Sequence, residues 1–246
     1  MAATIRGIVL AGGFGTRIRH LLPDVPKPMA PVAGRPFLEW VLMHLSRSAG
    51  IDTFLLSTGH LADRIEHHFS AHPLPGLEVQ CCPETTPLGT GGGIVHCVHG
   101  DTRPPPDFWL VANGDSIVLA DLQPLLAAAA APGHAGALLA LRMEDASRFG
   151  TVERAPDGTL AGFREKQPGA GLINAGVYLL RHHLIEHFPA RRPLSLEHDV
   201  FPRLKTDHRI AVVECDAPFI DIGTEASFRH ADTFLRENIH RLSPQP

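Results

Sequence analysis

The chain has 246 residues and a formal net charge of −4 at pH 7, with 44% hydrophobic and 20% charged residues. This profile is typical of a folded globular protein and excludes wholesale disorder, and the lack of a basic excess argues against a dedicated nucleic-acid binder. No apolar run approaches the roughly 18 residues of a membrane span, so we expect neither nucleic acid nor a membrane as a partner.

The amino-terminal residues and the cysteines indicate the compartment. An apolar run begins at Ile5, which leaves no room for a signal peptide. The four cysteines lack zinc-type spacing and are too few for a disulfide scaffold, so we expect a protein of the reducing cytoplasm. The sixteen histidines show no converging set of three or four ligands, and surface or helix-end positions are favoured over a metal site.

The first half of the chain alternates short apolar runs with helical patterns. Strands are expected at residues 5–10, 53–57, 77–81 and 108–112, and helices at 37–45, 61–69 and 91–98. Alternation of this kind favours a mostly parallel sheet covered by helices on both faces.

The second half is less regular. It predicts strands at 136–142 and 173–180 and a hairpin over 151–162 around Asp157-Gly158. Thr224 can cap a final helix, whose apolar stripe is Phe228, Ala231, Leu235, Ile239 and Leu242. The stripe's spacing favours packing on the parent domain; contact with a second copy in a homodimer is the alternative. We expect one α/β domain over residues 1–246. Its first half is expected to be doubly wound, and its second half to insert antiparallel strands.

A glycine-rich loop follows the first strand. It reads Leu10-Ala11-Gly12-Gly13-Phe14-Gly15-Thr16-Arg17. Glycines after a strand let backbone N–H groups approach phosphate oxygens, although an ordinary tight turn is the alternative. A dinucleotide fingerprint would need Gly where Ile18 stands, and a P-loop would need Gly-Lys-Ser/Thr. Both of those classes are therefore disfavoured.

This loop and the Pro26-Lys27-Pro28 segment resemble the sugar-1-phosphate nucleotidyltransferases, whose first motif is G-x-G-T/S-R-x-x-P followed by P-K. Later motifs of that family follow in order along nearly the whole chain: 87–92 (PLGTGG), 113–115 (NGD), 149–152 (FGTV), 165–166 (EK), 174–176 (NAG) and 219–224 (FIDIGT). Each motif is weak alone, but the ordered set is very specific. The proline expected soon after Arg17 comes only at Pro23, so we expect a longer or differently bent loop.

Within the family, PKPMAPVAGRPFLEW, PLGTGGGI, SLEHDVFPRL and FIDIGT look most like the D-glycero-α-D-manno-heptose 1-phosphate guanylyltransferases. These enzymes make a GDP-heptose for bacterial surface polysaccharide. The resemblance implies a Rossmann-like three-layer sandwich, Mg²⁺ dependence, and transfer of GMP from GTP to a sugar 1-phosphate with release of pyrophosphate. Residues 1–115 would mainly bind the nucleotide, and residues 116–246 mainly the sugar phosphate.

Catalysis of this reaction is mostly charge neutralisation and positioning. Arg17 would hold the β- and γ-phosphates, Lys27 the α-phosphate, and Lys166 the phosphate of the incoming sugar. Lysine is rare here: it supplies only Lys27, Lys166 and Lys205 among the 22 basic residues. A retained lysine can mark a site that needs a compact point charge.

Two aspartates are expected to hold the metal. Asp115 follows a buried strand, where such sheets bind ligands, and Asp221 follows the apolar stretch 217–220. Two carboxylates facing bound phosphates suit Mg²⁺, whereas a lone Asp in a turn is ordinarily a cap or turn former. Without the metal, the two carboxylates are expected to repel each other.

The resemblance implies two further groups of binding residues. The nucleotide would meet Leu10, Ala11, Gly12, Gly13, Gly15, Thr16, Glu84, Gly89, Thr90 and Asn113. The sugar would meet Gly150, Glu165, Asn174 and Glu197, with a purely structural role equally open for Glu197.

Other interpretations remain within and outside this class. Mannose 1-phosphate or N-acetylmuramate 1-phosphate could be the acceptor and UTP the donor, since Gly91-Gly92-Gly93-Ile94 also resembles the muramate-type enzymes. A catalytically silent nucleotide-sugar sensor would be free to lose Arg17, Lys27 or Asp115, yet all three are present.

Overall fold

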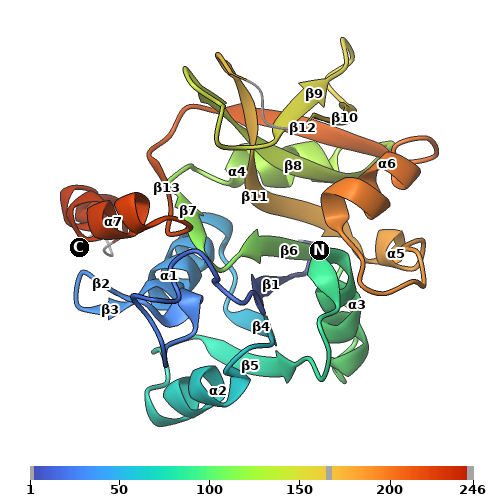
Figure 1. Ribbon diagram of the computed structural model, residues 1–246. Helices are drawn as coiled ribbons and strands as arrows, with labels where there is room; N and C mark the ends of the chain where they lie inside the picture. Colours follow the sequence, from blue (N-terminus) through green and yellow to red (C-terminus); the bar gives the residue numbers. More distant parts are fainter. Residues whose placement is uncertain (1–2, 165–167, 243–246) are drawn as a thin grey trace.

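The computed structural model describes residues 3–164 and 168–242. A mixed sheet of nine strands forms the centre of this part (Figure 1), with β8 and β12 added beside a run ordered β10-β9-β11-β6-β1-β4-β5. Its strands are β1 (Ile5–Ala11), β4 (Thr53–Thr58), β5 (Glu78–Pro83), β6 (Phe108–Asn113), β8 (His134–Met143), β9 (Thr151–Arg154), β10 (Leu160–Arg164), β11 (Gly171–Arg181) and β12 (Arg209–Cys215).

The pairing directions confirm the predicted α/β fold. In the first half, β1 runs parallel to both β4 and β6, and β4 runs parallel to β5. In the second half, β11 lies antiparallel to β6 and β8, and β9 and β10 form the predicted hairpin. The carboxyl ends of β1, β4, β5 and β6 therefore share one edge of the sheet.

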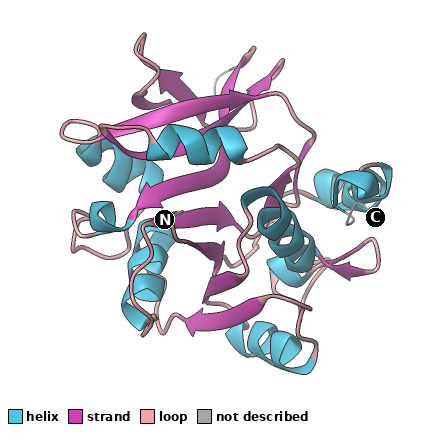
Figure 2. Cartoon of the chain, turned by 180° about the vertical axis from the view of Figure 1, so that it is seen from behind, coloured by secondary structure: helices cyan, strands magenta, loops and turns pink. Residues whose placement is uncertain are grey.

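Helices cover both faces of this sheet, as Figures 1 and 2 show. They are α1 (Phe37–Ala49), α2 (Ala62–Ala71), α3 (Gly89–Gly100), α4 (Gln123–Ala130), α5 (His182–Ile185), α6 (Phe201–Leu204), α7 (Glu225–Glu237) and α8 (Ile239–Leu242). Side chains of α1, α2 and α4 share one apolar core with Val9, and those of α3 and α6 share the other with Ile8. Adjacent residues of β1 thus face opposite cores, which is why a buried parallel strand is a continuous apolar run.

The final helix begins as the sequence predicts. Thr224 and Ser227 form a reciprocal capping box at the start of α7. Ala231 and Leu235 of the predicted stripe are buried, whereas Ile239 is 39% exposed. The predicted stripe is interrupted at Ile239 because α7 ends at Glu237 and a separate short helix, α8, begins at Ile239.

Several elements were not predicted from the sequence. These include the short helices α4, α5 and α6, the strand β12, a 3₁₀ turn (Lys27–Met29) and a π-helical turn (Leu196–Val200). Two small ladders were also not predicted, β2 (Pro31–Val32) with β3 (Arg35–Pro36) and β7 (Ser116–Val118) with β13 (Phe219–Asp221). The last ladder matters for function because it places the segment around residue 221 beside the end of β6. Among the described helices, none combines the length and apolarity needed to cross a bilayer.

Candidate active site

A cavity of about 420 Å³ opens at the carboxyl ends of β1 and β6, where parallel sheets commonly bind ligands. Many of the residues predicted for the site line it: Gly13, Gly15, Thr16, Arg17, Lys27, Asn113, Asp115, Gly150, Asn174 and Asp221. They come from segments far apart in the sequence, and the fold brings them together around this cavity.

The glycine-rich loop is pressed against Lys27. Gly15 has φ of 58°, and a Cβ at this position would lie only 2.9 Å from Lys27 Cβ, so glycine is required for both backbone conformation and space. Beyond Arg17 the chain coils in successive turns, with Ile18 N donating to Gly15 O and Leu21 N donating to Ile18 O. The chain therefore turns repeatedly between Arg17 and the late proline, Pro23.

A stiff backbone presents Lys27 to the cavity. The residue opens a single 3₁₀ turn (Lys27–Met29) between Pro26 and Pro28, and its side chain is 14% exposed. Lys27 Nζ donates to Asp115 Oδ2 at 2.6 Å. The lysine is therefore held at a defined place, and its charge is balanced by a carboxylate.

The ladder between β7 and β13 brings the two predicted metal ligands together. Asp221 pairs with Ser116 in register, and Ile222 N donates to Asp115 O at 2.9 Å. Gly223 N donates to Asp221 Oδ1 at 2.8 Å. A Cβ on Gly223 would lie 2.6 Å from Asp221 Oδ1 and 3.4 Å from Lys27 Nζ, so these groups surround one point.

Arg148 also lines the cavity, although the sequence analysis did not select it. Arg148 Nη2 donates to Asp221 Oδ2 at 3.2 Å, and the guanidinium lies 5.3 Å from the centroid of the Phe149 ring. Only its position directly before the Phe149-Gly150-Thr151-Val152 motif could have indicated it. Each aspartate thus has its own cation, which offsets the repulsion between the two carboxylates that the sequence predicts.

The residues present fit a divalent cation bound together with phosphates. Asp115 and Asp221 supply hard oxygen donors from neighbouring segments, as Mg²⁺ prefers. Within the described residues no group of three or more His, Cys, Asp or Glu side chains could hold a metal ion. Two carboxylates alone leave most of the metal's coordination shell to phosphate and water, which is common for Mg²⁺.

Further residues predicted to bind the nucleotide lie at the neighbouring strand ends. Glu84 accepts hydrogen bonds from Ser57 Oγ at 2.7 Å and from Leu88 N at 2.9 Å. A Cβ on Gly12 would lie 3.4 Å from Glu84 Oε1, which puts this carboxylate beside the glycine-rich loop. Leu10 and Ala11 belong to β1 itself, and Leu10 pairs with Asn113 of β6.

Gly89 and Thr90 contact the chain where it enters the π-helical turn, at Leu194 and Leu196. Gly89 has φ of 76°, and a Cβ there would lie 2.6 Å from Leu194 O, so this glycine has a packing reason of its own. Thr90 Oγ1 accepts a hydrogen bond from Leu196 N at 2.8 Å. Leu194 N donates to Leu88 O at 2.8 Å. The segment 88–91 is therefore bonded directly to the segment 194–196.

A second cavity of about 590 Å³ adjoins the first, and the two share Phe149, Gly150 and Asn174. Glu197 lines the second cavity, together with Glu153, Arg164 and Lys205. The predicted residues Glu165 and Lys166 lie outside the described residues, directly after Arg164. The two adjoining cavities provide room for two substrates side by side.

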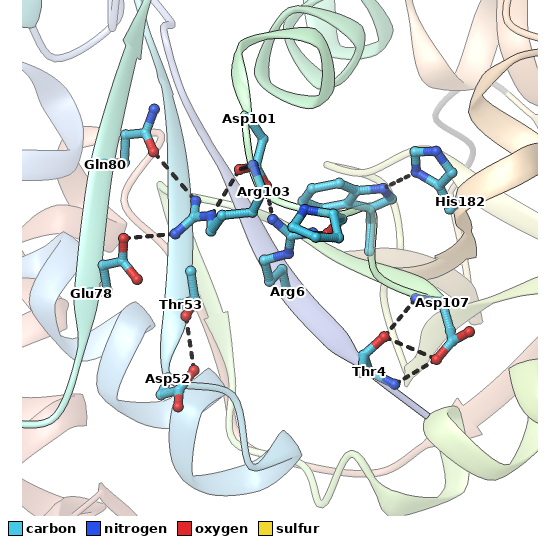
Figure 3. Close-up of polar contacts among 12 residues, drawn as sticks. Thr4, Arg6, Asp52, Thr53, Glu78, Gln80, Asp101, Arg103, Asp107 and His182 are labelled. Carbon is cyan, nitrogen blue, oxygen red and sulfur yellow. Dashed lines mark hydrogen bonds and ion pairs between the residues drawn. The ribbon is translucent and has the colours of Figure 1, made fainter. Parts of the chain in front are cut away.

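A third cavity, of about 280 Å³, lies at the opposite edge of the sheet. Figure 3 shows the network of polar contacts around it. Asp101 accepts hydrogen bonds from both Arg6 and Arg103, and Arg103 also reaches Glu78 at 2.7 Å. Trp109 Nε1 donates to His182 Nδ1 at 2.9 Å. These charged groups pair with one another at the amino ends of the strands. The network therefore links neighbouring strands of the sheet, and its charges need no ligand to balance them.

Comparison with known proteins finds guanylyltransferases that match nearly the whole chain. The chain is 35% identical to the mannose-1-phosphate guanylyltransferase of Mycobacterium tuberculosis, over 98% of this chain and 67% of that protein. It is 32% identical to the D-glycero-α-D-manno-heptose 1-phosphate guanylyltransferase of Aneurinibacillus thermoaerophilus, over 96% of this chain and 100% of that protein. HddC from Yersinia pseudotuberculosis, complexed with GMP-PN, superposes with a TM-score of 0.81 at 28% identity, covering 93% of this chain and 98% of HddC.

The family match covers almost the whole chain. Residues 6–238 match the family described as nucleotidyl transferase. This confirms the resemblance on which the sequence analysis depends, and with it the Rossmann-like fold. The chain belongs to the nucleotidyl transferase family.

Proposed function

We propose that this protein transfers GMP from GTP to a sugar 1-phosphate and releases pyrophosphate, with D-glycero-α-D-manno-heptose 1-phosphate as the preferred acceptor. The observation that carries the proposal is one cavity in which Arg17, Lys27 and Arg148 surround two carboxylates beside a glycine-rich loop. Such a cavity suits two polyanions that must approach each other. The A. thermoaerophilus relative, matched end to end, has this donor and acceptor in its name.

Residues of the first half would bind the triphosphate. Backbone N–H groups of the loop at Gly13, Gly15 and Thr16 would donate to phosphate oxygens. Arg17 would hold the β- and γ-phosphates and stabilise the pyrophosphate that leaves. Lys27 would exchange Asp115 for the α-phosphate, and its fixed backbone limits the entropy lost on engaging the ligand.

Asp115 and Asp221 would hold Mg²⁺ between the two substrates. When bound, the metal supplies positive charge that offsets the charge of the converging phosphates. With that charge in place, the two aspartates no longer need Lys27 and Arg148 as counter-ions. Both cations would then be available to the phosphates.

The acceptor would occupy the second cavity, with its phosphate directed towards the first. Lys166 and Arg148 would bind that phosphate, while Gly150, Glu165, Asn174 and Glu197 would surround the sugar. One acceptor oxygen attacks the α-phosphorus as the bond to the β-phosphate breaks, so pyrophosphate carries away the bond's electrons. A phosphate monoester is largely doubly ionised at pH 7, so the attacking oxygen needs no general base.

Mannose 1-phosphate is the second candidate acceptor. The 35% identity to the M. tuberculosis protein, named as a mannose-1-phosphate guanylyltransferase, favours it. Both candidates share the donor, the reaction and the sugar's manno configuration, and they differ in the length of the exocyclic carbon chain.

A pyrophosphate-release assay tests donor and acceptor together. The purified protein is offered each of four nucleoside triphosphates with heptose, mannose, glucose or N-acetylmuramate 1-phosphate, with Mg²⁺ present. We expect GTP with the heptose 1-phosphate to give the highest kcat/KM. A preference for UTP would overturn the guanylyltransferase assignment while leaving the reaction type intact, and a preference for mannose 1-phosphate would replace the acceptor alone.

A further inference from the structure

Tyr178 is a buried tyrosine with a polar environment around its hydroxyl alone. It lies in β11, is the only tyrosine of the chain and is 0% exposed. Its ring packs on Phe201 with 5.4 Å between centroids. The hydroxyl accepts a hydrogen bond from Asn174 Nδ2 at 2.7 Å and donates one to Glu197 Oε1 at 3.0 Å. A buried hydroxyl with both partners satisfied fixes the direction of the groups it joins.

Glu197 is the group that this arrangement fixes. Besides Tyr178, Asn174 Nδ2 donates to its Oε1 at 3.3 Å and Ser195 Oγ donates to its Oε2 at 3.2 Å. A carboxylate offers about four lone-pair positions, so these three bonds leave one. Glu197 lines the second cavity, and that position is available to a ligand there.

A purely structural role does not explain this carboxylate well. Among the described residues no Lys, Arg or His forms an ion pair with Glu197, so its charge is held by neutral donors only. Glu197 is half-buried, and removing a charged group even partly from water costs free energy unless it is compensated. The backbone that carries it is a π-helical turn, a conformation that occurs frequently at functional sites.

We propose that Tyr178 is a positioning residue, which aims the Glu197 carboxylate at one hydroxyl of the acceptor sugar. The inference rests on the proposed function, because it assigns the second cavity to that sugar. Burial, and next the charge of Glu197, raise the pKa of Tyr178 well above its usual value. The phenol therefore keeps its proton throughout the working pH range and remains a donor to Glu197.

Three variants test this assignment. Tyr178→Phe removes the hydroxyl and keeps the ring, so KM for the acceptor should rise about three- to tenfold, the effect of one hydrogen bond. Glu197→Gln should raise it at least as much. The double variant should be little worse than Glu197→Gln, because the proposed effect of Tyr178 on the sugar is exerted through that carboxylate. KM for GTP should stay within about twofold throughout.

A matched control separates positioning from loss of structure. Trp109→Phe removes another buried aromatic donor, the one bonded to His182 at 2.9 Å, at the opposite edge of the sheet. It should lower the melting temperature and leave KM for the acceptor unchanged. Additive losses in the double variant, or an equal rise of both KM values in Tyr178→Phe, would overturn the inference. Failure of the proposed function would appear separately, as a wild-type protein that turns over no sugar 1-phosphate.

Discussion

At the scale of single residues, the main finding is that each acidic side chain of the first cavity has its own cation. Lys27 pairs with Asp115 at 2.6 Å and Arg148 with Asp221 at 3.2 Å. The site is therefore nearly neutral before any substrate binds. If the proposed function is right, binding of the metal and triphosphate would exchange these ion-pair partners, rather than bring an anion to bare carboxylates.

The aspartates should act as one unit in catalysis and have little effect on folding. Asp115→Asn and Asp221→Asn should each lower kcat by several orders of magnitude, because metal-borne charge is worth several kcal/mol. The double change should cost little more than the worse single one. Melting temperatures without ligand should fall, since each change removes a partly buried ion pair and leaves its cation without a carboxylate partner.

The control for these variants is Asp157→Asn, which also removes an Asp–Arg contact at 3.2 Å but in the β9–β10 hairpin. It should leave kcat unchanged. Fully additive losses in kcat for the two site variants would show that the carboxylates act separately. A clear rise in melting temperature without ligand would instead show that repulsion between them dominates.

Arg148 should compete with the metal while assisting the reaction. Arg148→Gln frees Asp221, so Mn²⁺ alone should bind about two- to fivefold more tightly, in line with the small worth of an exposed pair. The same change should lower kcat/KM for the sugar phosphate, because a cation facing its phosphate is lost. Free Mn²⁺ is measured by electron paramagnetic resonance and kcat/KM by pyrophosphate release.

Arg142→Gln is the matched control for Arg148, because Arg142 is also exposed and paired with one acidic residue, Glu214. Arg142→Gln should change neither the affinity for Mn²⁺ nor kcat/KM for the sugar phosphate. Weaker Mn²⁺ binding in Arg148→Gln would indicate a structural role for this arginine.

Sequence reasoning located the groups whose chemistry is tied to a motif, such as Arg17, Lys27 and Asp115. It missed Arg148 and Tyr178 for a physical reason. Their partners, Asp221 and Glu197, stand 73 and 19 residues away along the chain, and no local pattern encodes such a pair.

At the scale of elements, the contact between the segment 88–91 and the π-helical turn joins the two proposed substrate sites. Thr90 Oγ1 accepts from Leu196 N, one residue before Glu197. Thr90→Val keeps the shape and removes this acceptor, so the turn should loosen and KM for the acceptor should rise about two- to tenfold. Thr90→Ser should behave like the wild type.

Steady-state kinetics with each substrate varied in turn measure this effect. A rise confined to KM for GTP would contradict it and would support the direct contact between Thr90 and the nucleotide that the resemblance implies.

Elements with a strong period could be predicted, and those made by tertiary contacts could not. The helix at 61–69 and the capped final helix follow from their apolar spacing. The π-helical turn has no such pattern. Its first N–H group, that of Leu196, donates to Thr90 Oγ1, and Leu194 just before it donates to Leu88 O, so its start depends on another part of the chain. Similarly, β7 and β13 are only three residues each, and each is a strand only because it pairs with the other.

At the scale of the whole molecule, His44 makes stability depend on pH. It is 4% exposed within α1, and burial lowers its pKa from 6.5 to about 4. As the pH falls, the unfolded chain therefore takes up this proton before the folded protein does. Stability is full above about pH 6.5 and is lost towards pH 4, by about 2 kcal/mol between pH 8 and pH 5 from this group.

Urea unfolding at pH 8 and pH 5 measures this loss. His44→Gln should reduce the difference between the two pH values by about 2 kcal/mol, whereas the exposed His67→Gln should leave it unchanged. An unaltered difference in His44→Gln would show that other groups carry the acid sensitivity.

The bond between the segments 88–91 and 194–196 also has a consequence for recombination. Gly89 packs on the backbone of Leu194 with no room for a Cβ, and Leu88 bonds to the same residue. In a chimaera that takes only the segment 88–91 from a relative, that segment would have to pack against a segment 194–196 from a different protein. Donor and acceptor preferences are therefore expected to be inherited together, and an exchange that alters one should carry both segments.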